Sequence, residues 1–477
     1  MANNSIIACP SGNISGIQNE NGSLEFLGIR YAAAKRFDAP VDTDSWTSTY
    51  EATKFGSISP QVPGMLETML GFNPADMDED CLFLNVYASE TPSQDTKKPV
   101  LVWIHGGAYT NGSGSTAWYH GGTLASQGSI VVTINYRLGA LGFLGDGNYG
   151  TLDMVSALRW VNKNIAAFGG DPNNVTIFGE SAGGSSVVAL TATSMTKGLV
   201  TKAWAMSPSL RQLRSKTEAD ISTRQFLDTA KCGSIEDLKV LSNQQIIDAT
   251  AKMFENVENY IATFSPTCGS SGLPDDIYAM SAKSGIPLVV GTNRDENRLW
   301  SALNPNNVPN DEETAKNYYK EALGESSDRA WSLYTKMRPN QSPIEMVAAM
   351  QTDQNFRAPA WDLCETRVKM GVSTWMYWFT WPTPIFDGIF GCCHALDLPF
   401  MFHNLDAPNV ELFTGDAPNR TTIANTFSSE LLSFAKDTSV SWPEFDLDNR
   451  STLQIDLDTK VINNPEPELR ELWSAKI

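Results

Sequence analysis

Short apolar runs alternate with helix-like patterns over residues 81–178 of the chain. The apolar runs have the length and composition of buried strands, which we expect at residues 81–88, 100–104, 130–136 and 175–178. Between them, residues 152–168 repeat apolar positions at the spacing of an amphipathic helix. Short, almost wholly apolar strands separated by helices are typical of a parallel sheet covered on both faces. The pattern therefore predicts the α/β class, with three layers built around a mostly parallel central sheet.

The pattern becomes mainly helical after residue 207. Helices are expected at residues 218–230, 236–241 and 244–257, and strands resume at residues 287–290 and 374–379. We interpret the segments at about 208–285 and 300–370 as helical cap insertions over the carboxyl edge of the sheet, where α/β folds bind ligands. No repeat, low-complexity tract or linker divides the sequence. Residues 1–477 are therefore expected to form a single domain.

Acidic residues outnumber basic ones by 54 to 35, which gives a formal net charge of −19. This sign is unfavourable for binding phosphate backbones or anionic membranes, so we expect neither nucleic acid nor a membrane as a partner. An acidic mouth that attracts cationic substrates would explain the charge, and so would an ordinary solvated acidic surface. The charge alone does not indicate a substrate.

The sequence carries no signal for export and no pattern for a metal. Residues 1–12 contain no basic side chain, and the apolar runs are strand-sized, so a cytoplasmic protein without a membrane span is expected. The seven cysteines lack metal-ligand spacing and are expected to be free thiols, with no metal or cofactor. Cys393 precedes His394, but no motif supports Cys393 as the nucleophile of a cysteine protease.

A candidate nucleophile lies in residues 174–184, which combine a strand, the turn Gly-Glu-Ser-Ala-Gly and the start of a small-residue helix. The G-x-S-x-G motif requires this context, with Ser181 at the tip of the turn. Gly179 and Gly183 fit because a tight strand-to-helix turn leaves no room for side chains. A chance match would lack the flanking elements, so we predict that Ser181 is a nucleophile.

A candidate oxyanion-binding loop follows the strand at residues 100–104. The sequence His-Gly-Gly-Ala-Tyr at residues 105–109 has small residues whose backbone N–H groups are unobstructed. Gly107 and Ala108, together with Ala182 after the serine, are the expected donors to a substrate oxyanion. The alternative is that this segment is only a turn at the end of a strand.

A serine hydroxyl needs a base, and the chain has only four histidines. On this kind of fold the order is serine, acid, histidine, which excludes His105 and His120 because they precede Ser181. His394 follows a strand and a loop near the carboxyl edge of the sheet, and His403 ends an apolar run. We favour His394 as the base, with His403 as the alternative and His105 as a brace for the oxyanion loop.

The acid that orients the histidine should follow another strand and precede His394. Residues 287–296 supply a strand, a turn and two adjacent carboxylates, Asp295 and Glu296. Either could fix the imidazole tautomer while the other caps the next helix. Spacing alone does not choose between them.

These segments together resemble the type-B carboxylesterase family, which includes cholinesterases and bacterial para-nitrobenzyl esterases and has the α/β-hydrolase fold. The motifs that carry the resemblance are at residues 26–32, 79–86, 135–139, 168–172 and 178–184. The resemblance implies Glu296 as the acid, because the family's glutamate closes a Gly-Thr-Asn-x-Asp-Glu segment. It also implies His394 as the base, at the start of residues 394–400.

Several positions refine what the resemblance implies. Cys81 matches a cysteine that closes a loop disulfide in secreted members, but no cysteine lies between Cys9 and Cys81, as in an intracellular, microbial-type member. The tryptophan that recognises choline falls near Phe72, so acetylcholine is not the expected substrate. Asn297 follows the acid where glycine is usual. Residues 106–109 look like the GGAX variant, whose members can accept esters of bulky tertiary alcohols.

The expected function is therefore hydrolysis of small to medium carboxylic esters through an acyl-enzyme intermediate, with Ser181, His394 and Glu296 as the triad. One alternative is an amidase or carbamate hydrolase that uses the same triad. Another is a binding protein like the cholinesterase relatives that have lost triad residues, although all three positions are intact here. Neither the acyl and alcohol preference nor the oligomeric state is indicated by the sequence.

Overall fold

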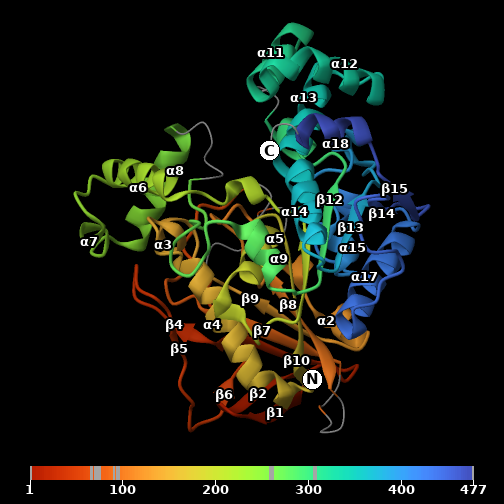
Figure 1. Cartoon of the computed structure of the whole chain (residues 1–477). Coiled ribbons are helices and arrows are strands. Elements are labelled where there is room, and N and C mark those ends of the chain that lie inside the picture. The colour runs from red at the N-terminus through yellow and green to blue at the C-terminus, as the bar shows by residue number, and fades with distance from the viewer. Residues whose placement is uncertain are drawn as a thin grey trace.

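The computed structural model describes residues 3–64, 68, 77–89, 92, 97–256, 263–304 and 309–474. Phe72, the position matched to the choline-binding tryptophan, lies outside these residues, as does Val257 at the end of one expected helix. A central sheet organises the described part of the chain, and helices cover it (Figure 1).

Within the described ranges, seven strands form the parallel part of the sheet. In spatial order they are β9 (Ile130–Ile134), β8 (Lys98–Ile104), β10 (Gly170–Glu180), β11 (Lys202–Met206), β12 (Leu288–Asn293), β13 (Thr374–Phe379) and β14 (Ser451–Ile455). Every residue of β9 and of β13 is buried, as expected for strands covered on both faces. The strand expected at residues 374–379 has the observed bounds, whereas β10 begins five residues before the expected 175.

Antiparallel strands extend this sheet at both edges. At one edge β7 (Phe83–Ala88) pairs antiparallel with β9 and is followed outward by β3 (Leu24–Arg30), β2 (Gly12–Gln18) and β1 (Asn3–Cys9). At the other edge β15 (Lys460–Asn463) pairs antiparallel with β14. The remaining short strands are β6 (Tyr50–Glu51), which pairs with β2, and the separate pair β4 (Ala32–Ala33) and β5 (Val41–Asp42).

The side chains of β8 show that the sheet has a core on each face. Val100 and Val102 belong to one hydrophobic cluster, and Leu101 and Trp103 belong to the other, because successive residues of a strand point to opposite faces. Residues of α4 (Tyr149–Asn164), α5 (Ala182–Ala192) and α14 (Ala358–Lys369) pack in the first cluster, and residues of α2 (Gly122–Ser126), α15 (Leu398–Met401) and α17 (Arg420–Asp437) pack in the second. The three-layer α/β architecture and the mostly parallel central sheet are therefore confirmed.

Helices occupy both segments that the sequence assigned to insertions. The first contains α6 (Lys216–Ala230), α7 (Ile235–Leu238), α8 (Asn243–Asn256) and α9 (Ile277–Lys283). The second contains α10 (Arg298–Leu303), α11 (Glu312–Leu323), α12 (Ser327–Met337), α13 (Pro343–Thr352), the π-helical turn η9 (Asp353–Arg357) and α14. In Figure 1, α6 to α8 form one lobe, and α11 and α12 project at the other end, near the C-terminal helix α18 (Pro467–Ser474). The other helices are α3 (Gly139–Phe143) and α16 (Glu411–Thr414).

No helix in the described ranges is long and apolar enough to cross a bilayer. All seven cysteines are free, and four of them, Cys81, Cys364, Cys392 and Cys393, are buried. Burial raises the pKa of the Cys393 thiol well above its usual value, so this group is not an activated thiolate.

Candidate active site

Ser181 lies at the junction of β10 and α5, in a backbone conformation that few residues adopt. Its φ and ψ angles are 57° and −121°, and its amide donates to the carbonyl of Met206 at the end of β11. The turn is tight enough that a Cβ at Gly183 would lie 2.0 Å from the carbonyl oxygen of Ile104. Such strain at an otherwise well-packed position is typical of a functional turn that presents a side chain.

The helix that follows the serine is entirely buried. All residues of α5 are buried, and Ala182 is its first residue, with no side-chain cap at Ser181. The first amides of a helix have no partner within it, so the Ala182 end of α5 favours negative charge beside Ser181. This is the placement expected for Ala182 from the sequence.

His394 and Glu296 are brought together although they are 98 positions apart along the chain. The Nδ1 atom of His394 lies 2.6 Å from Oε2 of Glu296, and the His394 amide donates to the Glu296 carbonyl at 3.2 Å. The other carboxylate oxygen, Oε1, accepts the amide of Asn293 at 2.7 Å. Glu296 is fully buried in the turn that follows β12, and it contacts the imidazole from there.

The competing candidates have other partners. Asp295 accepts hydrogen bonds from Arg294 and from the amide of Cys392, the latter at 2.9 Å, so it ties two loops together. His403 lies 2.8 Å from Oδ1 of Asn425 through its Nε2 atom. The geometry thus favours Glu296 over Asp295 and His394 over His403.

The second nitrogen of His394 faces a residue that the sequence did not single out. Nε2 lies 3.0 Å from Oε1 of Glu180, the residue before Ser181, without the alignment of a hydrogen bond. Among the described residues, no hydrogen bond joins Ser181 Oγ to His394. Such bonds are often long in enzymes without substrate and tighten when it binds. Nε2 faces Glu180 in this structure, and Ser181 is the next residue along the chain.

Buried carboxyl groups control the charge of this cluster. Burial alone would lower the pKa of His394, but Glu180 and Glu296 outweigh it and raise that pKa. Burial raises the pKa of Glu180, and His394 only partly offsets this. Burial, followed by Glu180 and Glu296, raises the pKa of Asp397 to about 8, so Asp397 is neutral at pH 7.

The loop after β8 is tightly folded against Ser181. Gly107, Ala108 and Tyr109 have φ angles of 100°, 52° and 62°, and a Cβ at Gly107 would lie 2.2 Å from the carbonyl oxygen of Asn111. A side chain on Gly106 would begin 3.2 Å from Cβ of Ser181, so this loop lies directly against the serine. The structure therefore brings Gly107 and Ala108 to the same site as Ser181.

His105 supports this loop from behind. Its ring stacks on Tyr136 with centroids 4.4 Å apart, and its Nδ1 lies 2.8 Å from the carbonyl oxygen of Gly106. Burial lowers the pKa of His105 to about 4, so the ring is neutral and adds no charge beside the reacting groups. The bracing role expected for His105 fits these contacts.

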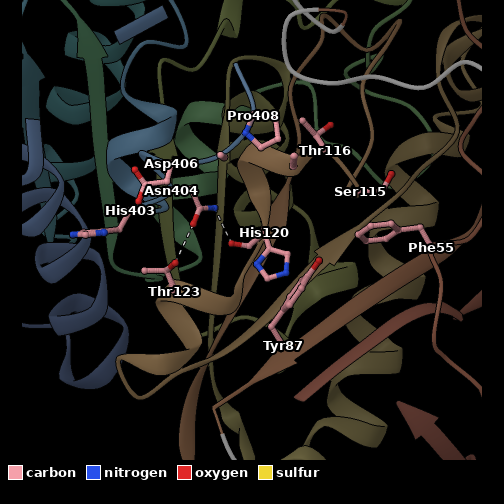
Figure 2. A pocket seen from close by; sticks show the side chains of 12 residues that line it. Phe55, Tyr87, Ser115, Thr116, His120, Thr123, His403, Asn404, Asp406 and Pro408 are labelled. Carbon is pink, nitrogen blue, oxygen red and sulfur yellow. Dashed lines mark hydrogen bonds between the residues drawn. The ribbon is translucent and has the colours of Figure 1, made fainter. Parts of the chain in front are cut away.

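A separate hollow of about 420 Å³ is lined by twelve residues that do not include Ser181, His394 or Glu296 (Figure 2). Several of its polar groups are bonded to other parts of the protein. Asn404 donates to the carbonyls of Trp118 and His120 and accepts from Thr123, and His120 lies 3.3 Å from Glu25. We do not assign this hollow to catalysis.

Sequence reasoning missed four side chains near the imidazole: Glu180, Trp300, Phe356 and Asp397. The rings of Trp300 and Phe356 each lie 4.9 Å from the His394 ring. Glu180 and Asp397 lie close in sequence to predicted site residues, since Glu180 precedes Ser181 and Asp397 is three residues after His394. Trp300 and Phe356 reach the site from α10 and η9, so only the fold reveals them.

Comparison with known proteins agrees with this geometry. Residues 3–473 match the model of the carboxylesterase family. The chain is 35% identical to a para-nitrobenzyl esterase of Bacillus subtilis, over 98% of both chains, and 30% identical to a fumonisin B1 esterase of Sphingopyxis macrogoltabida, over 91% of this chain and 84% of that one. A phenmedipham hydrolase of Pseudarthrobacter oxydans is 30% identical, over 91% of this chain and 92% of that one.

Solved structures of esterases are also similar to this chain. A PNB esterase superimposes with a TM-score of 0.86 at 33% identity, over 98% of this chain and 99% of that one. A carboxylesterase of Geobacillus stearothermophilus does so with a TM-score of 0.86 at 32% identity, with the same coverage. The fold and the site thus define a carboxylic-ester hydrolase with the α/β-hydrolase fold. The chain belongs to the carboxylesterase family.

Proposed function

We propose that this protein hydrolyses small to medium carboxylic esters through a triad of Ser181, His394 and Glu296. The contact of 2.6 Å between His394 Nδ1 and Glu296 Oε2 carries the proposal, because it favours the tautomer with its proton on Nδ1 and leaves Nε2 as the nitrogen that accepts a proton. Ser181, the nucleophile of the G-x-S-x-G motif, follows Glu180 in the chain, and the Glu180 carboxylate lies 3.0 Å from this nitrogen.

The reaction proceeds in two steps. Ser181 Oγ forms a bond to the ester carbonyl carbon while its proton moves to His394 Nε2, and the bond to the alcohol breaks as His394 returns that proton to the leaving oxygen. Water then attacks the acyl-enzyme by the same route and releases the carboxylic acid. The backbone N–H groups of Gly107, Ala108 and Ala182 hold the oxyanion in both steps, and each well-placed donor is worth about 3 kcal/mol.

The test uses an alkyl fluorophosphonate probe, which reacts with an activated serine. We expect the wild-type protein to be labelled and Ser181→Ala to remain unlabelled, with no hydrolysis of a para-nitrophenyl ester above background. Labelling of Ser181→Ala, or no labelling of the wild type, would contradict the proposal. His394→Gln should lose labelling as well, because the serine then lacks its base.

Substrate range is tested with matched compounds. An ester and an amide with the same acyl group separate ester hydrolysis from amide hydrolysis. A carbamate of the same alcohol tests whether the protein is a carbamate hydrolase. Para-nitrophenyl esters of increasing acyl length measure the acyl preference. Esters of a tertiary alcohol then test whether the Gly107 and Ala108 loop accepts bulky alcohol groups. Faster turnover of the amide than of the ester would overturn the substrate class.

A further inference from the structure

A π-helical turn interrupts the long helix beside the imidazole. The turn η9 (Asp353–Arg357) lies directly between α13 and α14, and Pro359 is near the start of α14. Proline has no amide hydrogen, so the carbonyl four residues earlier loses its helical partner, which favours a widened turn. Such turns are rare and are frequently found at functional sites.

Both ends of this turn are fixed by buried groups. The hydroxyl of Tyr334 donates to Asp353, which is 2% exposed. Arg357 is 1% exposed and forms an ion pair with Glu466. Its guanidinium carbon, Cζ, lies 3.8 Å from the ring centre of Trp378. A turn that is held at its two ends presents the side chains between them, at residues 354–356, in fixed positions.

One of these side chains is Phe356, which packs against the His394 imidazole. The ring centres of Phe356 and His394 are 4.9 Å apart at an interplanar angle of 42°. Trp300 lies at the same distance from His394 and stacks on Phe356 with ring centres 6.0 Å apart. The two aromatic rings therefore limit how far the imidazole can rotate.

The residues just before the turn hold the loop that carries Glu296. The Asn297 amide donates to Oγ1 of Thr352 at 3.0 Å, and the Asn297 side chain donates to Oε1 of Gln351 at 2.9 Å. Asn297 is adjacent to Glu296, and Thr352 is buried. The side-chain bond depends on asparagine, since a glycine at position 297 could not make it.

We propose that residues 351–356 act as one positioning element for both partners of Ser181: Gln351 and Thr352 fix the loop of the acid, and Phe356 fixes the ring of the base. The inference rests on the proposed triad. It assigns Asn297 a role in this chain that a glycine could not fill. A triad must be held within about 0.5 Å of its productive geometry, so loss of these contacts lowers the rate of chemistry more than substrate binding.

The first test compares two substitutions at Thr352. Thr352→Val keeps the shape but removes the acceptor for the Asn297 amide, and Thr352→Ser keeps that acceptor. We expect Thr352→Val to lower kcat about tenfold with KM changed less than about twofold, and Thr352→Ser to restore most of the loss. Equal kcat for wild type and Thr352→Val, or equal loss in both variants, would overturn the proposal.

The second test is a double-mutant cycle between Asn297 and Gln351. Asn297→Gly and Gln351→Leu remove the same hydrogen bond from opposite sides. If Gln351 acts through Asn297, each single variant lowers kcat by a similar factor, and Gln351→Leu has no further effect on the Asn297→Gly background. Multiplicative losses would show that the two residues act independently and would contradict the proposal.

The third test separates positioning by Phe356 from its contribution to folding. Phe356→Leu should lower kcat about tenfold with little change in KM. Phe226→Leu is the control, because Phe226 is a fully buried ring that packs on Phe264 with centres 5.4 Å apart, away from the triad. It should lower the melting temperature and leave kcat near the wild-type value. Equal effects of the two variants on kcat would overturn the role of Phe356.

Fluorophosphonate labelling distinguishes failure of this inference from failure of the proposed function. A wild-type protein that is not labelled at Ser181 overturns the triad and this inference with it. Wild-type labelling together with unchanged kcat in Thr352→Val, Asn297→Gly and Phe356→Leu overturns this inference alone.

Discussion

The His394 imidazole lies between two carboxylates, with Nδ1 at 2.6 Å from Glu296 and Nε2 at 3.0 Å from Glu180. Both carboxylates stabilise the protonated ring and raise the pKa of His394. They differ in position, because Glu296 orients the ring through Nδ1, whereas Glu180 faces Nε2, the nitrogen that must accept the serine proton. Both carboxylates are buried, which strengthens their effect on the imidazole.

Glu180→Gln should therefore move the acid limb of the kcat/KM profile to lower pH. Burial lowers the pKa of His394, Glu180 is the largest contribution that raises it, and an amide does not stabilise the imidazolium. We expect a shift of about one pH unit or more with an uncharged ester as substrate. An acid limb that stays in place or moves to higher pH would rule out this role for Glu180.

Asp397→Asn should leave the reaction near neutral pH almost unchanged. Burial and the two glutamates raise the pKa of Asp397 to about 8, so the wild-type group is neutral at pH 7 and resembles an amide. The folded pKa exceeds the unfolded one, 3.8, so wild-type stability from this group is greatest below pH 4 and falls as pH rises through 8. The melting temperature of Asp397→Asn relative to wild type should therefore increase from pH 5 to pH 8. A constant difference across that range would show that Asp397 is charged throughout.

The sequence predicted the layers and the nucleophile because both depend on local signals. Buried strands such as Thr374–Phe379 are runs of apolar residues, and the turn at Ser181 needs glycines at fixed offsets. The outer strands β14 and β15 were not predicted, because polar residues interrupt them and their pairing is tertiary.

Local sequence signals could not identify which carboxylate orients His394. Asp295 and Glu296 are adjacent carboxylates on one turn, and spacing could not separate them. Their roles differ because Asp295 accepts the Cys392 amide while Glu296 reaches His394, and both contacts come from a loop about 100 residues away. The π-helical turn could not be predicted from the sequence either, because its residues also occur in ordinary helices. Pro359 is the one local sign of an irregular turn.

Gly107→Ala should disable the oxyanion loop without a large loss of stability. Gly107 has a φ angle of 100°, and a Cβ would lie 2.2 Å from the carbonyl oxygen of Asn111, so the loop must move. Loss of one oxyanion donor typically lowers kcat by about 10²-fold. Gly128→Ala is the matched control, because its φ is 102° but no atom lies within 4 Å of the added Cβ. We expect both variants to melt a few degrees lower and only Gly107→Ala to lose kcat; equal kcat values would contradict the assignment of this loop.

Glu466 should contribute to stability in a way that depends strongly on pH. Burial raises its pKa, but Arg357 and Arg338 outweigh burial and bring it to about 2, below the ordinary value of 4.5. The folded pKa is lower than the unfolded one, so the stabilisation is fully present above pH 4.5 and is lost as pH falls towards 2. A shift of this size corresponds to about 3 kcal/mol, so Glu466→Gln should lower the free energy of unfolding by about that amount at pH 7.

Urea unfolding at several pH values measures the difference in free energy of unfolding between wild type and Glu466→Gln. This difference should become smaller below pH 4.5. Because Glu466 anchors Arg357 at the end of the π-helical turn, Glu466→Gln should also lower kcat at pH 7 in protein that is still folded. Glu365→Gln is the control, since Glu365 pairs with Arg450 and Arg470 and not with that turn. A loss of kcat in Glu365→Gln equal to that in Glu466→Gln would show that the turn is not the route by which Glu466 affects catalysis.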